Sequence, residues 1–367
     1  VVSEFLRYFL LSEAKSGRIG AAAPGVGIHH IGSARLGAWA VPLPPPEEQM
    51  RIVAALEEQF SRLDAGEAQL ERIVKRILQW RRTLVIAGLT GQLTEVDPKD
   101  EPADVALARA TAARGTRRRL GTQTPPLMDL VDRVPAHWVW STVEDVATRV
   151  TVGHVGPMKH EYVPEGIAFL RSQNVRENTF ATEGLRYISP EFHERLRKSR
   201  IVGGDVVIVR SGTVGVSCVV PDWLGEANCA DLVIVQRPVA VDPHFLAYYI
   251  NAMTRGYVAS ETVGVALAHF NTRSVAQLPI PVPPLQEQER IVAVLQQRLS
   301  VVEIVTASVL QASRRSTQLR SSVLAAAFRG SLVPQDPTDP PATRLLDRIR
   351  TERAAATPVR RRPRVKA

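Results

Sequence analysis

Apolar residues recur at every seventh position in the first third of the chain, which predicts a long helix with one apolar stripe. The stripe consists of Leu56, Leu63, Leu70, Ile77 and Leu84, and Val53 and Phe60 lie on the adjoining seam. A weaker stripe follows later in the chain, at Val292, Leu295, Leu299 and Val302. We expect two long helices that pair through these residues in an antiparallel, coiled-coil-like manner. The pattern does not separate contacts within the pair from contacts to a partner subunit.

Both helices are preceded by the same proline-led motif. Residues 44–53 read Pro-Pro-Pro-Glu-Glu-Gln-Met-Arg-Ile-Val, and residues 283–292 read Pro-Pro-Leu-Gln-Glu-Gln-Glu-Arg-Ile-Val. Prolines prevent a helix before them and suit its first turn. Glu48 and Glu287 then carry negative charge near a helix N-terminus, where the helix dipole favours it. The motif therefore predicts two helix starts.

The repetition extends beyond the helices. Gly91 matches Gly330, and Asp97-Pro98 matches Asp336-Pro337, at one constant offset. Such a period indicates two copies of a whole module. Since the first copy has only about 40 residues before its helix, we expect residues 1–43 to be the closing part of a module whose body is absent.

Short β-rich runs between the helices predict a mixed α+β domain. Residues 167–170, 205–209, 216–220 and 232–235 are bounded by Gly, Pro and Asp. The expected order is a recognition-domain remnant at 1–43, a first long helix at 44–93, a linker at 94–133, a complete domain at 134–283, a second long helix at 284–332 and a basic tail at 333–367. The first helix is expected to reach about Ala87, with Gly88 and Gly91 as stop signals.

Composition narrows the class of protein. The chain has 46 Lys and Arg against 37 acidic residues, a formal charge of +9, with runs at residues 117–119 and 360–362. This balance favours a polyanionic partner, although a solvated tail has the same composition. Two cysteines are too few for a disulfide framework or a usual zinc site, which indicates a reducing, cytoplasmic setting. No apolar run approaches the roughly 20 residues of a membrane span, so we expect a soluble protein with no membrane partner.

The motifs together resemble the specificity subunit of type I restriction-modification systems. The residues that carry the resemblance are the duplicated Pro-Pro-x-x-Glu-Gln-x-x-Ile-Val helix start, the Gly-Asp-Val-Val-Ile-Val-Arg-Ser-Gly-Thr-Val-Gly stretch at 204–215 and the Pro-Ala-His-Trp start of the domain at 135–138. In that family two target-recognition domains, each followed by a long helix, read the two halves of a split DNA site. The resemblance implies a sequence-specific, non-catalytic DNA-binding subunit.

The resemblance also implies partners. They are double-stranded DNA, methyltransferase subunits and a restriction subunit; S-adenosylmethionine, Mg²⁺ and ATP are expected on those partner subunits, with no cofactor or metal on this chain. An ordinary member has two complete recognition domains, whereas this chain has one and the tail of another. A second copy of the chain is therefore an alternative partner, which would give a symmetric split site.

Candidate DNA-binding residues lie in the predicted loops of the 134–283 domain. Arg, Gln and Asn side chains make paired hydrogen bonds with guanine or adenine edges, and several of the residues are basic enough to contact phosphates. An ordinary polar turn or a solvated basic face explains the same residues equally well. The candidates are Lys159, Arg171, Ser172, Gln173, Asn174, Arg197, Lys198, Arg210, Thr213, Asn271 and Arg273.

Two other classes of function are weighed against this one. A DNA-modifying enzyme would need a catalytic Asn/Asp-Pro-Pro-aromatic motif, and Asp339-Pro340-Pro341-Ala342 lacks the aromatic residue. A coiled-coil scaffold without DNA binding would not need the α+β domain or the net basic charge. The sequence favours DNA recognition over both.

Overall fold

The computed structural model describes residues 1–22, 31–114, 132–158, 160–254 and 271–355. The chain divides into two compact units, one formed by residues 1–76 and 304–367 and the other by residues 77–303. Two long helices, α4 (Pro46–Leu89) and α11 (Leu285–Phe328), each run through both units. The mixture of long helices with short strands confirms the α+β class predicted from the sequence.

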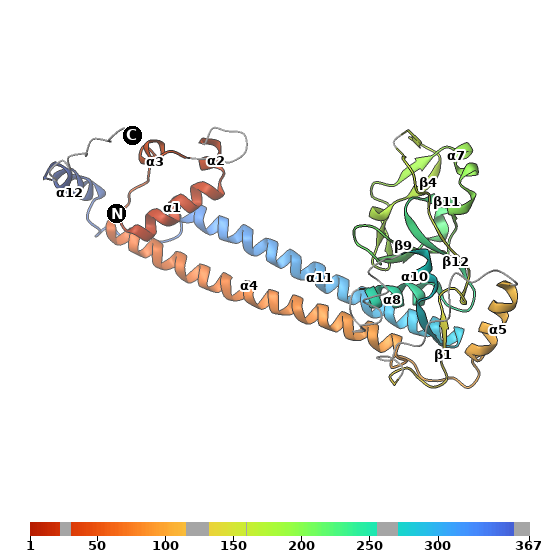
Figure 1. The fold of residues 1–367 in the computed structure, drawn as a ribbon. Coiled ribbons are helices and arrows are strands. Elements are labelled where there is room, and N and C mark those ends of the chain that lie inside the picture. The colour runs from red at the N-terminus through yellow and green to blue at the C-terminus, as the bar shows by residue number, and fades with distance from the viewer. Residues whose placement is uncertain (23–30, 115–131, 159, 255–270, 356–367) are drawn as a thin grey trace, which may run out of the picture. The chain divides into compact units, whose positions relative to one another are not determined.

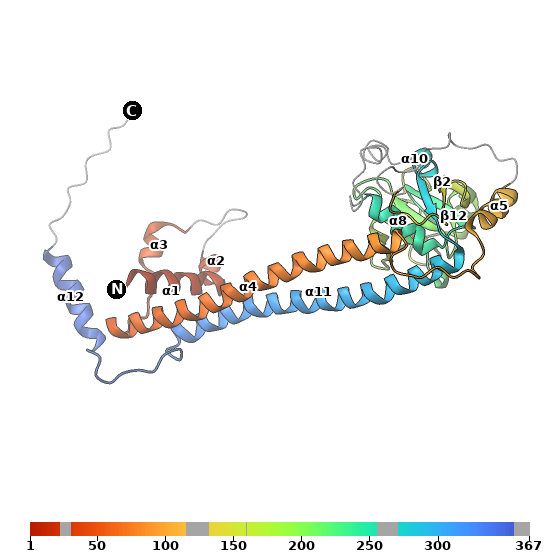
Figure 2. The same cartoon turned by 90° about the horizontal axis from the view of Figure 1, so that it is seen from below.

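The first unit is helical. It holds α1 (Ser3–Lys15), α2 (Arg18–Ala22), α3 (Ser33–Gly37), α12 (Ala342–Ala355) and the adjoining halves of α4 and α11. The halves lie side by side and antiparallel (Figures 1 and 2), as the Arg320–Asp64 contact of 2.6 Å and the Ser316–Glu67 hydrogen bond of 2.8 Å require. Helix α1 packs against this pair through Phe5, which contacts Phe328 edge to face.

The stripe predicted from the sequence is buried most deeply near the helix ends. In the first unit Leu56 is fully buried, and Val53 and Phe60 are buried with it, whereas Leu63 and Leu70 are half-buried. In the second unit Ile77 is half-buried. The buried stripe residues there are Leu84, Val292, Leu295, Leu299 and Val302. The helices therefore pair through the predicted seam.

Gly88 has a different role from the predicted stop signal. It lies inside α4, and a Cβ atom there would come within 2.9 Å of Leu295 and 3.3 Å of Ile291. The glycine allows α11 to approach α4 closely. Gly91, with φ of +68°, is the residue that ends the helix, because glycine adopts this left-handed conformation without a steric penalty.

Helix α11 differs from the expectation that no apolar run approaches the length of a membrane span. It includes an 18-residue window of mean hydropathy 1.3, long and apolar enough by composition alone to cross a membrane. Its apolar residues Ile291, Leu295 and Val302 are buried against the core of the second unit, and Leu324 is buried in the first. Of the apolar window, 28% is buried, and a single helix with such a window is weak evidence for a membrane span.

The second unit contains helix α5 (Ala103–Arg114) and, after it, the strands and helices of the predicted domain. The strands form a pair, β1 (Val139–Thr142) with β13 (Pro279–Val282); a four-stranded sheet β10-β9-β12-β2; a five-stranded sheet β3-β7-β4-β11-β8; and the hairpin β5-β6. Their bounds are β2 Ala147–Val152, β3 Tyr162–Val163, β4 Ile167–Leu170, β5 Val175–Arg176, β6 Thr179–Phe180, β7 Arg186–Ile188, β8 Arg200–Ile201, β9 Val206–Val209, β10 Ser217–Val219, β11 Ala227–Cys229 and β12 Leu232–Pro238.

The side chains of β9 and β12 point alternately to the two faces of the four-stranded sheet, and this sheet is packed between two other layers. In β9, Val206 and Ile208 enter one hydrophobic core, whereas Val207 and Val209 enter another. Since successive side chains of a strand point to opposite faces, the four-stranded sheet is covered on both faces. One face packs against the five-stranded sheet, and the other packs against α8 (Pro243–Thr254) and α10 (Thr272–Ala276). Helix α7 (Pro190–Arg195) covers the outer face of the five-stranded sheet through Phe192.

The sequence repeat reappears as two matching sets of contacts. The Gln49 side chain accepts from the Val2 amide at 2.9 Å and donates to the Pro44 carbonyl at 2.8 Å. Gln288, its counterpart, accepts from the Asp242 amide at 2.7 Å and donates to the Pro283 carbonyl at 2.8 Å. Each glutamine thus ties its helix start to the start of an earlier helix, α1 for Gln49 and α8 for Gln288.

Each helix start also binds the tail of the other helix. Arg51 forms a two-bond ion pair with Asp339, and Arg290 forms one with Asp100. Because these residues occupy equivalent positions in the two copies, the contacts exchange partners between copies. Within each unit, one ion pair therefore links the helix start of one copy to the segment after the helix of the other copy.

Acid should weaken the ion pair between Arg290 and Asp100. The Arg290 guanidinium lowers the pKa of the Asp100 carboxyl below its ordinary value of 3.8. A carboxyl with a lower pKa in the folded chain stabilises the fold above its unfolded pKa, and this stabilisation is lost as pH falls through the folded pKa. We expect Arg290→Ala to lower the melting temperature at pH 7, with a difference from the wild type that shrinks below about pH 4. Thermal unfolding followed by circular dichroism at pH 7 and pH 3 checks this. A difference that is the same at both pH values would show that the lost stability comes from packing and not from the charge pair.

Candidate nucleic-acid interface

Several loops of the second unit meet at one end of the two stacked sheets. The parallel strands β4 and β11 end side by side, because the Ala230 amide donates to the Leu170 carbonyl at 2.9 Å. His154, just after β2, bridges to Ala230, and its carbonyl accepts from Asp231 at 3.0 Å. The loop after β9 joins them through Ser211, whose hydroxyl donates to the Asp231 carboxylate at 3.0 Å. We call residues 153–158, 171–174, 210–215 and 230–231 the loop rim.

The Arg-Ser-Gln-Asn turn at 171–174 belongs to the loop rim, and its side chains fix the neighbouring loop. Arg171 and Gln173 both donate to the Gly184 carbonyl, at 2.7 and 3.0 Å. Asn174 is fully buried: its amide nitrogen donates to the carbonyls of Ala181 and Glu183, and its oxygen accepts from the Arg171 amide. In this arrangement Asn174 positions the turn and does not present its amide to a base. The buried asparagine follows a strand just as a base-reading one would, so sequence alone does not distinguish the two.

Ser172 and Gln173 are more accessible than Asn174. Gln173 is exposed and Ser172 half-buried. The Arg171 guanidinium also lies near the Tyr162 ring, 5.8 Å from its centroid, and Arg186 approaches the same ring at 5.9 Å. These cation–aromatic contacts hold two cations at the edge of the five-stranded sheet. Tyr162 and Arg186 were missed in the sequence, because strands of two and three residues give no periodic signal.

Arg210 and Thr213 occupy the loop after β9. Arg210 is paired with Asp231, 3.4 Å away, so part of its charge is already neutralised. Thr213 is exposed, between Gly212 and Gly215, both of which have positive φ. The loop rim thus offers hydroxyl and backbone groups as well as cations.

Arg197 and Lys198 are exposed on a short 3-10 turn, η2 (Arg197–Ser199), that leads into β8. Because β8 runs antiparallel to β11, this turn lies next to the β11 end of the loop rim. Nearby, the Arg195 guanidinium stacks over the Phe192 ring at 4.8 Å and lies 3.5 Å from Glu161. Arg197 and Lys198 are therefore the predicted cations best placed beside the rim for phosphate contact.

The remaining candidates lie elsewhere. Asn271 is the N-cap of α10, where its side chain accepts from the amides of Arg273 and Ser274 at 2.9 and 3.0 Å. This cap explains the asparagine structurally. Arg273 is exposed on the same short helix, which packs on the four-stranded sheet away from α7. Lys159 and the arginine runs at 117–119 and 360–362 lie outside the described residues.

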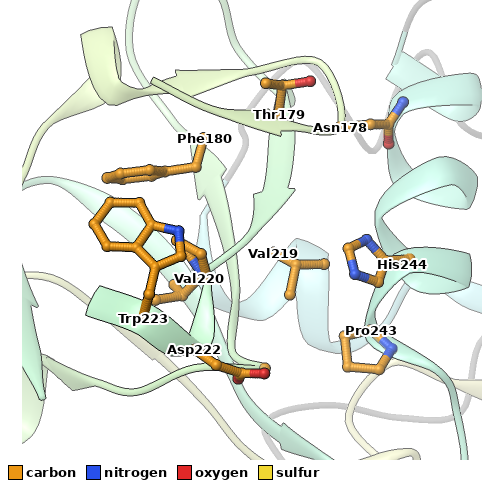
Figure 3. A pocket seen from close by; sticks show the side chains of 11 residues that line it. Asn178, Thr179, Phe180, Val219, Val220, Asp222, Trp223, Pro243 and His244 are labelled. Atoms are coloured by element: carbon orange, nitrogen blue, oxygen red, sulfur yellow. The ribbon is translucent and has the colours of Figure 1, made fainter. Parts of the chain in front are cut away.

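An aromatic pocket opens at the opposite end of β9 and β10 from the loop rim. Figure 3 shows the Phe180 and Trp223 side chains together on one side of the pocket, where their rings meet edge to face with a centroid distance of 5.7 Å, and His244 and Asn178 on the other side. The cavity has a volume of about 490 Å³, and Trp223 is 67% exposed. Trp223 follows Pro221 and Asp222, where a strand ends. This position was the sequence signal that could have predicted an exposed aromatic residue.

Comparisons with known proteins agree with this arrangement. Residues 135–310 match the family model "Type I restriction modification DNA specificity domain". The chain is 25% identical over 352 residues to the type I restriction enzyme EcoBI specificity subunit of Escherichia coli, covering 92% of this chain and 69% of that protein. It is 23% identical over 370 residues to the EcoDI specificity subunit of Escherichia coli, covering 97% and 78%.

A solved structure has a similar fold. It comes from work on the "structural basis underlying complex assembly and conformational transition of the type I R-M system", with a TM-score of 0.54 and 21% identity over 89% of this chain and 71% of that one. Together with the duplicated helix starts and the layered domain between them, these matches identify the family. The chain belongs to the type I restriction-modification specificity subunits, the non-catalytic subunits that recognise DNA sequence.

Proposed function

We propose that the domain at residues 134–283 reads one half of a split DNA site and that the loop rim faces the DNA. The observation that carries this assignment is the gathering of four loops and the exposed Arg197–Lys198 turn at one end of the stacked sheets. Loops on a rigid scaffold are where proteins commonly place base-reading side chains. Within the rim, Gln173 is the side chain best suited to read a base, because it is exposed and its amide oxygen can still accept.

Arg197 and Lys198 are assigned to phosphate contact. Each neutralised phosphate contributes about 0.9 to the slope of log affinity against log salt concentration. We expect the double variant Arg197→Gln/Lys198→Gln to reduce this slope by about 1.8 and to weaken binding to every duplex similarly. Fluorescence anisotropy with labelled duplexes at several salt concentrations measures it.

A matched control removes two charges from the other unit. Arg348 and Arg350 are exposed on α12, so Arg348→Gln/Arg350→Gln changes the net charge equally. The control should leave the slope unchanged. If both double variants lower the slope to the same extent, the effect is a general one of net charge, and the rim is not the DNA-binding face.

We assign the docking of methyltransferase subunits to the surface around Trp223. Its position at the opposite end of β9 and β10 leaves the loop rim free for DNA, and an exposed tryptophan beside a pocket is typical of an interface anchor. Trp223→Ala should weaken association with the cognate methyltransferase subunit by about 30-fold or more while DNA binding by the chain alone is unchanged. Analytical ultracentrifugation of the mixture tests this, and an unchanged complex would move the interface elsewhere, with Trp80, 47% exposed on α4, as the next candidate.

The restriction subunit is a further partner in this complex. The partner subunits bind S-adenosylmethionine, Mg²⁺ and ATP, and the complex acts in the cytoplasm. The second half of the DNA site is then read by another recognition domain. Two identical copies of this chain would give a palindromic split site, since two-fold symmetry of the protein imposes the same symmetry on the DNA.

A further inference from the structure

The hairpin β5-β6 links the loop rim to helix α4 inside the second unit. At the turn of the hairpin, the Arg81 guanidinium of α4 lies 3.1 Å from the Glu177 carboxylate. Both side chains are mostly buried, with exposures of 25% and 17%. Because a partly buried ion pair is screened by salt less than an exposed one, this contact fixes the turn to the helix more firmly than a surface pair would.

The next residue of the turn is bound to two further elements. Asn178 has a left-handed backbone, with φ of +57°, and its amide donates to the Ser217 carbonyl of β10 at 2.9 Å. Its side-chain oxygen accepts from Asn251 of α8 at 2.8 Å, and Figure 3 shows Asn178 beside that helix. Asn251 is 1% exposed and also donates to the Ser217 carbonyl, at 2.9 Å. Helices α4 and α8 and strand β10 therefore all hold the turn.

The other end of the hairpin holds the Arg-Ser-Gln-Asn turn of the loop rim. Asn174, directly before β5, donates through its side chain to the Ala181 carbonyl at 2.9 Å, and the Ala181 amide donates to the Asn174 carbonyl at 2.9 Å. Gln173 donates to the Gly184 carbonyl at 3.0 Å. The side chain assigned to base reading is thus oriented by the segment that follows the hairpin.

The hairpin depends on these anchors for its position. Its strands β5 and β6 have two residues each, and a two-stranded hairpin is at best marginally stable by itself. A recognition side chain must be held within about 0.5 Å of its productive place. Contacts at the turn of the hairpin therefore decide how well Gln173 is placed at its other end.

We propose that Arg81 and Asn251 are positioning residues for base recognition. Neither lies on the loop rim, yet together they fix the hairpin that sets where Gln173 lies. A change on α4 should therefore alter which base is read and leave the phosphate contacts of the Arg197–Lys198 turn in place. The effect on base reading rests on the proposed function, whereas the coupling of α4 to the rim rests on the contacts of the hairpin alone.

Reversing the charges of the ion pair tests the coupling in the full chain without DNA. Arg81→Glu places two carboxylates against each other and should speed hydrogen exchange of the amides of Asn174, Asn178 and Ala181 by about tenfold, as expected for the loss of a charged hydrogen bond. The double variant Arg81→Glu/Glu177→Arg restores opposite charges and should return exchange to the wild-type rate. Exchange followed by mass spectrometry of peptides that span residues 171–184 measures both.

The same variants test base reading in the complex with the cognate methyltransferase subunit, by mapping modified bases across the genome. Arg81→Glu should make one half of the split motif degenerate, and the double variant should restore it. A loss of general stability would instead reduce modification at every site and leave the motif as it is. The slope of log affinity against log salt concentration should be the same for Arg81→Glu as for Arg298→Glu, which changes the net charge equally.

Arg298→Glu is the matched control, because Arg298 is exposed on α11 in the same unit. It should change neither the exchange rates nor the motif. Asn178→Gly is a milder second variant: glycine adopts the left-handed conformation without strain, so only the side-chain contact with Asn251 is lost. We expect exchange to be about threefold faster in this variant. Circular dichroism verifies that each variant remains folded.

The proposal is overturned if Arg81→Glu speeds exchange no more than Arg298→Glu does, or if the double variant exchanges as fast as Arg81→Glu. Faster exchange in Arg81→Glu with an unchanged motif would remove the role in base recognition. A wild-type complex that modifies DNA without any motif would contradict the proposed function, and the exchange rates would still decide whether the hairpin couples α4 to the rim.

Discussion

Gly91→Ala is expected to destabilise the second unit by about 2–4 kcal/mol, the sum of left-handed backbone strain and overpacking. The added methyl group would lie 2.4 Å from the Pro135 ring, which cannot move aside as a flexible side chain could. Gly330→Ala, at the equivalent position, meets open space and should lose only about 1 kcal/mol from the strained backbone. Hydrogen exchange of the amides in β1 and β13 measures the first effect directly.

The pair of variants separates two explanations of the repeated glycine. If both variants lose the same stability, then the left-handed φ alone explains the glycines, and the packing of Pro135 and Trp138 beside Gly91 contributes nothing. A larger loss at Gly91, confined to the second unit, is the result that the packing predicts.

Leu295→Ala should have a second large effect. Leu295 is fully buried on α11 and lies against Gly88 of α4, where an added Cβ atom would come within 2.9 Å of its side chain. Removing a buried leucine side chain costs about 2–5 kcal/mol, because the transfer free energy is lost and a cavity remains. Leu319, 52% exposed on the same helix, is the control, and Leu319→Ala should change stability by no more than about 0.5 kcal/mol.

Urea unfolding followed by tryptophan fluorescence reports mainly on the second unit, where Leu295 and four of the five tryptophans lie. A loss for Leu295→Ala no larger than that of Leu319→Ala would mean that the helices can relax into the space. The close approach at Gly88 would then be an incidental contact.

The helices were predictable because their signals are local and repeated. A heptad stripe of Leu and Ile, a proline-led start and a glycine stop each depend on a few neighbouring residues, and two copies of the motif reinforce the prediction. Gly88 was the exception. It resembles a stop signal in sequence, and only the approach of Leu295 from the other helix reveals its role.

The candidate interface was less predictable for a physical reason. Asn174 and Gln173 are neighbours of similar chemistry, yet one is buried with its amide engaged and the other is exposed. The difference comes from the carbonyls of Ala181 and Glu183, which reach Asn174 only after the hairpin folds back. Similarly, residues 153–158, 171–174, 210–215 and 230–231 come together only because of the order of the strands in the sheets. Some strands that are neighbours in these sheets are far apart in the sequence, so their order cannot be predicted from neighbouring residues.

The exchange of partners between copies was also hidden. The sequence repeat predicts equivalent positions for Arg51 and Arg290, and for Asp100 and Asp339, but not that each arginine bonds to the aspartate of the other copy. That pairing requires the helices to be antiparallel, which the heptad pattern allows without requiring.

The central claim is that this chain selects a DNA sequence through the domain at 134–283. The most direct measurement co-expresses the chain with its cognate methyltransferase subunit in a methylation-deficient host and maps modified bases across the genome. The account predicts one split motif, of which one half changes when Gln173 is replaced and is unaffected by Arg348→Gln. Modified bases without any motif, from a complex that remains intact on gel filtration, would contradict it.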